Sequence, residues 1–462
     1  MAFPGRRSPE SQDTTASEGH RTKNGTGLKQ YHHMSATLKT VTLGCKVNQY
    51  ETEYVREGLF GIGYRDASQE EAADLCIVNT CTVTSEGDSK SRQIIRRLAR
   101  DNPGTRIVVM GCYATRAPEE VAALPGVAEV VTDKRELPDL LGRFGVVDIP
   151  TGISQFGNRH RAYVKVQDGC LLRCSYCIIP KVRPRLYSRA SEHIVDEVRR
   201  LLDNGYREFV LTGVHLGHYG VDWNAGKPKS EWYRLADLVR QIVQIDGDFR
   251  VRLSSIEATE VTRELVGVMA EFPDKVCPHL HICLQSGSDR ILRRMKRRWG
   301  VKRFLDRCRL VAETLDKPAL TTDVILGFPG ETEADFEATC STVREAGFSK
   351  IHTFPFSPRR GTPAAEMSDM VPKRIKAERS QQLRTIESEL REQYFQSLLG
   401  TRLRVLVEGP SERGANWMTG TSCRYAPVEF PGDSAVESSL VEVNAEYAAN
   451  DRIVGGHRRL KQ

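Results

Sequence analysis

Short apolar, β-branched runs alternate with stretches of helical periodicity from about residue 38 onward. The first series predicts three strands, each followed by a helix, at residues 40–44 and 48–59, 75–79 and 85–100, and 106–111 and 118–124. Strands and helices that alternate in this way form a parallel α/β sheet. The pattern stops at residues 144–156, where Gly, Pro, Ser and Thr cluster without helical periodicity, so we predict a domain boundary there.

A second alternating series follows this boundary. It predicts six further strands, at residues 161–167, 208–212, 249–254, 279–285, 320–327 and 350–356. Six βα repeats imply a partial barrel. After a charged helix near residues 373–399 the pattern becomes β-type, with strands expected at residues 403–408, 417–421, 426–430 and 439–443. This tail predicts a small β-barrel.

The chain is therefore predicted to be an α/β protein with a small β-barrel at its C-terminus. We expect four segments: a disordered extension at 1–36, a parallel α/β domain at 37–150, the partial barrel at 156–397 and the β-barrel at 398–462. The first segment is rich in Ser, Thr, Gly and charge and lacks apolar periodicity. Met34 stands directly before the first predicted strand, so the functional chain begins either at Met1 or at Met34.

Composition narrows the class of protein. The formal charge of +7 and a pI near 8.7 favour an anionic partner such as nucleic acid. The longest apolar runs, such as residues 107–110, are too short to span a bilayer, so no membrane partner is expected. Twelve cysteines in a large chain without the apolar core of a secretory signal indicate a reducing cytoplasm, where grouped cysteines serve metal or redox chemistry.

The most compact cysteine group has the spacing CxxxCxxC and is formed by Cys170, Cys174 and Cys177. It stands where the first strand of the predicted barrel ends. Three thiolates on one loop can bind one iron–sulfur cluster, which leaves one of the four irons of a cubane cluster open. That iron could chelate the amino and carboxylate groups of S-adenosylmethionine (SAM), and an electron from the cluster would then release a 5′-deoxyadenosyl radical. A zinc site usually takes a fourth Cys or His at matching spacing, and none stands next to this loop.

Three other cysteines lie far apart in the sequence but share a position relative to predicted strands. Cys45, Cys81 and Cys112 each follow a strand of the first series. Ligands gather beyond the carboxyl ends of the strands in an open parallel sheet, so these thiols can converge and hold a second cluster with one free iron. On this pattern alone, three buried core cysteines are an equally good explanation. We expect the remaining cysteines to be core residues: Cys76, Cys277, Cys283, Cys308, Cys340 and Cys423.

Several stretches together resemble the methylthiotransferase family of radical SAM enzymes, over nearly everything from Leu38 to the C-terminus. Besides the Cys170 loop, they are residues 42–53 (TLGCKVNQYETE), 79–84 (NTCTVT), 111–114 (GCYA), 284–288 (LQSGS) and 323–332 (DVILGFPGET). The sequence around Cys45 is most similar to that of the branch that methylthiolates N6-threonylcarbamoyladenosine at position 37 of tRNA. One departure is Pro184, because many relatives have Gly after the arginine that corresponds to Arg183; Pro removes an amide donor and fixes the backbone.

This resemblance implies two 4Fe–4S clusters, one on Cys45, Cys81 and Cys112 for sulfur insertion and one on Cys170, Cys174 and Cys177 for radical formation. It implies that SAM is both the radical source and the methyl donor. It also implies that the C-terminal β unit is an OB-like TRAM domain, that the partner is the anticodon region of ANN-decoding tRNA, and that a flavodoxin or ferredoxin supplies electrons. Within such barrels, three glycines are expected to contact SAM: Gly213, Gly327 and Gly330.

Other signals have two explanations each. The three glycines could be ordinary βα turns. A run of basic residues could bind tRNA phosphates or form a solvated helix face; it comprises Arg290, Arg293, Arg294, Lys296, Arg297, Arg298, Lys302 and Arg303, with Lys181, Arg183, Arg185 and Arg189 as a second group. Four histidines could be metal ligands but are more often hydrogen-bonded core or rim residues, namely His215, His218, His279 and His281.

Three functions remain open at this point. The first is methylthiolation of threonylcarbamoyladenosine-37 in tRNA. The second is methylthiolation of isopentenyladenosine-37 in tRNA or of an aspartate in a ribosomal protein. The third is a non-catalytic RNA-binding protein, against which the presence of all six cysteines counts. No residue is identified as a proton acceptor.

Overall fold

The computed structural model describes residues 36–157, 159–449 and 451–457. The predicted disordered extension and the question of a start at Met34 lie outside these residues. The segment boundaries near residues 150, 156 and 398 stay predictions. Among the described residues, no helix combines the length and the apolar character needed to cross a membrane.

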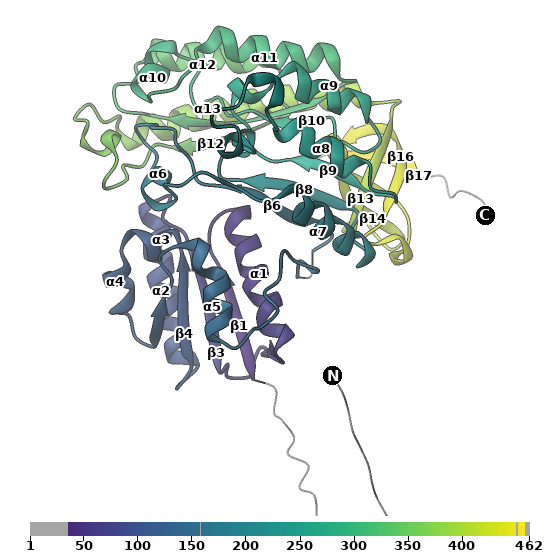
Figure 1. The fold of residues 1–462 in the computed structure, drawn as a ribbon. Coiled ribbons are helices and arrows are strands. Elements are labelled where there is room, and N and C mark those ends of the chain that lie inside the picture. Colours follow the sequence, from purple (N-terminus) through teal and green to yellow (C-terminus); the bar gives the residue numbers. More distant parts are fainter. Residues whose placement is uncertain (1–35, 158, 450, 458–462) are drawn as a thin grey trace, which may run out of the picture. The chain divides into compact units, whose positions relative to one another are not determined.

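The first part of the chain forms a five-stranded parallel sheet (Figure 1). The strands lie in the order β2-β1-β3-β4-β5, and every neighbouring pair is parallel. Three of them correspond to the predicted strands, and the short β2 and β5 add an edge on each side. Their bounds are β1 (Thr37–Thr42), β2 (Arg65–Asp66), β3 (Leu75–Thr80), β4 (Arg106–Gly111) and β5 (Val127–Val130).

Helices cover both faces of this sheet. Successive side chains of a strand point to opposite faces, so Ile77 of β3 packs with one set of helices and Val78 with the other. Apolar residues of α1 and α5 cover the first face, and those of α2 and α4 cover the second. Cys76 is fully buried on the second face, as expected for a core residue. The helices are α1 (Lys46–Gly61), α2 (Ser85–Asp101), α3 (Cys112–Arg116), α4 (Pro118–Ala122) and α5 (Leu137–Arg143).

The central part forms the predicted partial barrel of six parallel strands. One sheet has the order β7-β6-β8-β9 and the other β10-β11-β12; the two-residue β7 pairs antiparallel with β6 and is additional to the six. Parallel bridges from Val251 to Val276 and from Ile256 to Ile282 join the two along β9 and β10. The strands are β6 (Ala162–Asp168), β7 (Tyr187–Ser188), β8 (Glu208–Gly213), β9 (Arg250–Leu253), β10 (His279–His281), β11 (Ala319–Leu326) and β12 (Lys350–Pro355).

One predicted strand is shorter than expected. The prediction covered residues 279–285, but β10 ends at His281. Gln285 has a φ of 68°, in the left-handed region that a strand does not use. The chain therefore turns at the carboxyl end of β10, although Gln285 still forms an isolated parallel bridge to Val324.

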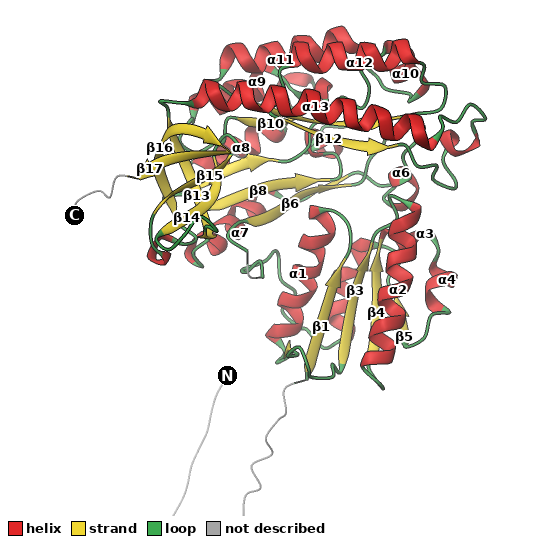
Figure 2. Cartoon of the chain, turned by 180° about the vertical axis from the view of Figure 1, so that it is seen from behind, coloured by secondary structure: helices red, strands yellow, loops and turns green. Residues whose placement is uncertain are grey.

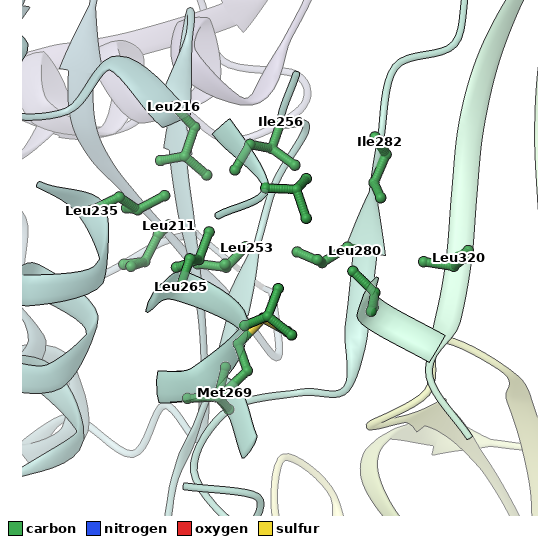
Figure 3. Packing of buried hydrophobic residues seen from close by; sticks show 14 of the residues in the cluster. Leu211, Leu216, Leu235, Leu253, Ile256, Leu265, Met269, Leu280, Ile282 and Leu320 are labelled. Carbon is green, nitrogen blue, oxygen red and sulfur yellow. The ribbon is translucent and has the colours of Figure 1, made fainter. Parts of the chain in front are cut away.

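Helices pack against the outer side of the barrel strands. Alternate positions such as Leu211, Leu253, Leu280 and Leu320 point outward and form one continuous apolar cluster with α8 and α9 (Figure 3). Burying one leucine side chain stabilises the fold by about 1.5–3 kcal/mol. Because this cluster contains more buried apolar residues than the other clusters of the described residues, it is the main core. The helices are α6 (Ile179–Val182), α7 (Ser191–Asp203), α8 (Leu235–Val243), α9 (Arg263–Glu271), α10 (Asp289–Arg294), α11 (Val301–Thr314), α12 (Glu333–Ala346) and α13 (Lys373–Leu398).

The C-terminal strands close into a barrel in the order β13-β14-β15-β17-β16 (Figure 2). This confirms the predicted β-barrel, with one strand more than expected. A glycine-rich strand has weak intrinsic propensity, which explains why the sequence did not reveal β17. A side chain at Gly455 would meet the Asn444 carbonyl oxygen at 2.1 Å. The strands are β13 (Arg402–Pro410), β14 (Trp417–Ser422), β15 (Pro427–Pro431), β16 (Leu440–Ala449) and β17 (Arg452–His457).

A buried charge cluster connects the base of the partial barrel to the C-terminal barrel. Glu208 accepts hydrogen bonds from Arg250 and from Arg252, whose Nε lies 3.0 Å from the carboxylate. The same guanidiniums donate to C-terminal carbonyls, Arg250 to Thr421 at 2.8 Å and Arg252 to Ser422 at 3.0 Å. All three charged side chains are at most 3% exposed. The carboxylate thus holds two arginines in position to bind the second barrel.

We expect Glu208→Gln to lower the free energy of unfolding by about 3 kcal/mol, because it leaves two guanidiniums buried without a counter-charge. Urea unfolding followed by tryptophan fluorescence measures this change. Glu271→Gln is the control: Glu271 pairs with Arg240 on the surface, where both side chains are about half exposed, and its loss should change stability by less than about 1 kcal/mol. Equal effects of the two substitutions would contradict the role given to Glu208.

Candidate functional site

The three dispersed cysteines lie at one edge of the five-stranded sheet. Cys81 and Cys112 directly follow β3 and β4, and Cys45 stands between β1 and α1, at the N-cap of that helix. The three strands are neighbours and run in the same direction. The sheet therefore brings Cys45, Cys81 and Cys112 to its carboxyl edge.

Local geometry shows how closely these thiols approach. A side-chain atom built on Gly44 would lie 3.1 Å from Cys81 Sγ, so the turn before Cys45 touches the second cysteine. Burial raises the pKa of Cys81, and the neighbouring thiols of Cys112 and Cys45 raise it further. At Gly111, φ is 98° and a side chain would meet the Thr80 carbonyl oxygen at 2.4 Å. Only glycine fits there, and it lets the chain enter α3 with Cys112 as its first residue.

The compact cysteine group follows β6. A tight turn at Gly169, with a φ of 78°, starts the loop; a side chain there would meet the Arg185 carbonyl oxygen at 1.8 Å. Burial raises the pKa of Cys177 to about 12, and the thiols of Cys174 and Cys170 act in the same direction. The structure thus brings Cys170, Cys174 and Cys177 together on one loop.

In each cysteine group, at least one thiol has a nitrogen-bearing side chain next to it. Arg183 Nε lies 3.4 Å from Cys112 Sγ, and Arg297 donates to Cys174 Sγ at 3.5 Å. His215 Nδ1 lies 3.7 Å from Cys170 Sγ. Three thiolates gathered at one point repel one another, and hydrogen-bond donors beside them stabilise the charged, metal-binding form. Side chains that donate to thiolates are expected around two iron–sulfur clusters, whereas six unrelated core thiols would not need them.

Arg183 connects the two cysteine groups. Its guanidinium is buried and donates to Glu51 of α1 at 2.7 and 2.8 Å, to Asp168 of β6 at 2.8 Å and to Asn48 at 3.0 Å. Lys165 donates to the same two carboxylates at 2.7 and 2.6 Å. Burial alone would raise the pKa of both carboxylates, but the two cations hold each below its usual value.

The departure at Pro184 leaves this arrangement in place. The Arg183 carbonyl oxygen accepts a hydrogen bond from the Cys170 amide at 3.3 Å, so the backbone and the side chain of one residue reach both cysteine groups. Pro184 itself is exposed. The expected place of Arg183 and Arg189 on a phosphate-binding surface is wrong. Arg183 is buried between its two carboxylates, and Arg189 pairs with Glu197 with its side chain only 12% exposed.

The three glycines predicted to contact SAM have different surroundings. Gly213 ends β8, and a side chain on it would meet Gln167 Oε1 at 2.9 Å. The amides of Gly327 and Gly330 donate to Glu331 and to the Asp369 carbonyl, both at 2.7 Å. Their φ angles are 68° and 76°. Tight turns account for the last two glycines, and contact with SAM stays a prediction for all three.

The histidines group with acidic side chains. The ligand atoms of His215, His218 and Glu260 lie within 4.8 Å of one another, and so do those of His281, Cys283 and Asp323. The first group stands beside Cys170 and includes the stacked rings of its two histidines. The second lies among the strands of the partial barrel.

The basic run does not form one exposed face. Arg290 pairs with Asp335, Arg294 with Asp369 and Lys302 with Asp306. Arg297 is 3% exposed and pairs with Glu257, so its expected place on a phosphate-binding surface is wrong. Four members are exposed and make no ion pair among the described residues: Arg293, Lys296, Arg298 and Arg303.

Comparison with known proteins identifies the family. A family model described as "Uncharacterized protein family UPF0004" matches residues 37–133, and one described as "Radical SAM superfamily" matches residues 164–343. The threonylcarbamoyladenosine tRNA methylthiotransferase MtaB of Bacillus subtilis is 38% identical over 440 residues, which cover 90% of this chain and 96% of that protein. The chain belongs to the radical SAM tRNA methylthiotransferase family. It is therefore a transferase whose cofactors are SAM and two 4Fe–4S clusters.

Other relatives place it within the same family. MtaB of Thermotoga maritima is 37% identical and covers 88% of this chain and 94% of its own length. The tRNA-2-methylthio-N(6)-dimethylallyladenosine synthase of Moorella thermoacetica is 33% identical and covers 89% of this chain and 96% of its own. Among solved structures, the radical SAM methyltransferase TsrM of Kitasatospora setae, at 15% identity, has a TM-score of 0.52 and covers 72% of this chain and 75% of its own. That similarity supports the fold.

We expect the reconstituted protein to contain iron and sulfide for two clusters per chain, and one cluster after Cys170, Cys174 and Cys177 are replaced by Ala, since the other three thiols would remain. Iron and acid-labile sulfide analysis measures this. Cys340→Ala, which removes a buried core thiol, should leave both clusters. Two clusters in the triple variant would show that the Cys170 loop is not a cluster ligand.

We expect Arg183→Met to weaken iron retention by the Cys45 group about ten-fold, because a donor beside Cys112 is lost. The substitution is made in the triple-alanine background, so that the remaining iron belongs to one group, and iron loss to a chelator is followed over time. Arg199→Met, which breaks an exposed pair with Asp196, is the control. Equal chelation rates in the two proteins would contradict the role of Arg183.

Proposed function

We propose that the protein methylthiolates adenosine 37 of tRNA, converting N6-threonylcarbamoyladenosine to its 2-methylthio derivative. The observation that carries this choice within the family is the order of the relatives. The first four relatives, all named for threonylcarbamoyladenosine, are 35–38% identical, whereas the next, named for dimethylallyladenosine, are 33–34% identical. The second candidate is therefore the isopentenyl (dimethylallyl) adenosine substrate.

Two cysteine groups are proposed as the cluster ligands: Cys45, Cys81 and Cys112, and Cys170, Cys174 and Cys177. Their convergence, and the donors beside Cys112, Cys174 and Cys170, support this assignment. When bound, the cofactors supply the radical that removes the hydrogen at adenine C2 and the sulfur and methyl group that replace it. We further propose that Gly213, Gly327 and Gly330 face SAM.

The protein's own residues hold the two reaction centres in a fixed relation. Arg183 binds Glu51 on the side of the Cys45 group and Asp168 on the side of the Cys170 group. This buried bridge keeps the place where sulfur is supplied next to the place where the hydrogen is removed. Both must act on the same adenine carbon, so a fixed geometry serves the reaction.

The tRNA contacts are proposed for two surfaces. The exposed basic residues Arg293, Lys296, Arg298 and Arg303 can neutralise phosphates. The C-terminal barrel is proposed to be a TRAM domain that binds the anticodon region of ANN-decoding tRNAs. A flavodoxin or ferredoxin is proposed as reductant, and the cytoplasm as the place of action, because that is where tRNA is used.

Nucleoside mass spectrometry of tRNA tests the proposal. We expect the 2-methylthio derivative of threonylcarbamoyladenosine to disappear when the gene is deleted and to return with the wild-type protein but not with a Cys170→Ala variant, which loses a cluster ligand. Loss of the methylthio-isopentenyl nucleoside instead would establish the second candidate. Unchanged tRNA, with sulfur gained by a ribosomal protein, would reject both.

A further inference from the structure

The side of the barrel strands that faces away from the helices is polar. Strand positions alternate, and the apolar members join the outer core, so their neighbours point into the lumen. His279 and His281 of β10 both lie within hydrogen-bond distance of Thr321 Oγ1, at 3.2 and 3.0 Å, and His281 Nε2 lies 3.2 Å from Asp323. The His352 ring lies 5.7 Å from that of His281. The lumen side of these strands is therefore lined by hydrogen-bonding groups.

Lys46 adds a cation to this space from the first part of the chain. It is the first residue of α1 and follows Cys45 directly. Its ammonium lies 5.9 Å from the centroid of the Tyr163 ring, on β6. Its charged neighbours include Arg252, Arg161 and Asp323. Tyr163 alternates with Ala162 and Val164, which face the outer core, so the Lys46 ammonium lies on the lumen side of β6.

The charged neighbours of Lys46 already have partners. Arg252 and Arg161 both pair with Glu208, at 3.0 and 3.4 Å, and Asp323 Oδ1 lies 3.2 Å from His281 Nε2, a contact that is ionic when His281 is protonated. Lys46, by contrast, makes no hydrogen bond or ion pair with any residue that the structure describes. A half-buried ammonium without a counter-charge is costly to the fold. Such a cost is typical of a group whose partner is a ligand.

We infer that Lys46 binds the carboxylate of the N6 substituent of the substrate adenosine; this rests on the proposed function, because threonylcarbamoyladenosine carries a carboxylate and isopentenyladenosine does not. In adenine, C2 and the carbon that bears N6 flank the same ring nitrogen. A substrate whose C2 lies near the Cys45 group therefore has its N6 substituent close by. The residue after Cys45 is well placed to bind it.

The test compares anticodon stem–loops that carry threonylcarbamoyladenosine or unmodified adenosine at position 37, bound to the reconstituted enzyme. We expect Lys46→Met to weaken binding of the first at least about ten-fold, because a desolvated charge pair is lost, and to leave binding of the second within about two-fold. Lys46→Arg should keep most of the preference. Lys229→Met, which removes an exposed lysine, should change neither.

A modified substrate isolates the pair. Conversion of the threonyl carboxylate to its amide should cost the wild-type enzyme the same factor as Lys46→Met, and should cost the Lys46→Met enzyme nothing more. An equal loss with both stem–loops would instead assign Lys46 to a phosphate, and loss of iron from Lys46→Met would assign it to the cluster; either result overturns the inference. An unchanged preference in Lys46→Met also overturns it.

Failure of the proposed function is distinguishable. If the wild-type enzyme itself does not prefer the threonylcarbamoyl stem–loop over one with isopentenyladenosine, the proposed substrate is wrong. If the wild type shows the preference and Lys46→Met keeps it, only the role of Lys46 is wrong.

Discussion

The buried guanidinium of Arg183 is the contact on which the arrangement of the two cysteine groups depends. It lies between Glu51 of α1 and Asp168 of β6, and it reaches Cys112 as well. A charge removed from water in this way is tolerated only when its hydrogen-bonding capacity is satisfied, which fixes its geometry. Glu51 and Asp168, each with Lys165 as a second donor, meet that condition. The main effect of this bridge is therefore to fix the position of one cysteine group relative to the other. Its contribution to stability is the smaller effect.

A similar buried carboxylate–arginine contact lies at the other end of the partial barrel. Glu208 neutralises Arg250 and Arg252, and the spare donors of both arginines bind carbonyl oxygens of the C-terminal barrel. Arginine suits both places because its planar group offers several donors in fixed directions. The central barrel is therefore joined by a buried carboxylate–arginine contact to the sheet that precedes it and to the barrel that follows it.

Much of this fold could be predicted from local sequence pattern. The features that could not be predicted depend on contacts between residues far apart in the sequence. Strand ends were visible in the sequence, so the convergence of Cys45, Cys81 and Cys112 followed from the rule for parallel sheets. Arg183 and its partner Glu51 lie more than one hundred residues apart in the sequence. No periodicity of the sequence encodes such a pair. Arg297 shows the opposite error. A dense basic run suggested a surface, whereas the structure turns this one member inward to Glu257 and Cys174.

The placement of cations near the cysteines follows from charge. A cluster held by three thiolates brings negative charge into a poorly solvated place, and Arg183 and Arg297 each offset part of it while also binding a carboxylate. Those carboxylates limit how much positive charge reaches the thiolates and fix the direction of the donors. Lys46 lacks such a carboxylate among the described residues, although it follows Cys45 directly. Arg183 and Arg297 are paired with carboxylates within the protein, whereas Lys46 is free to bind the substrate carboxylate proposed above.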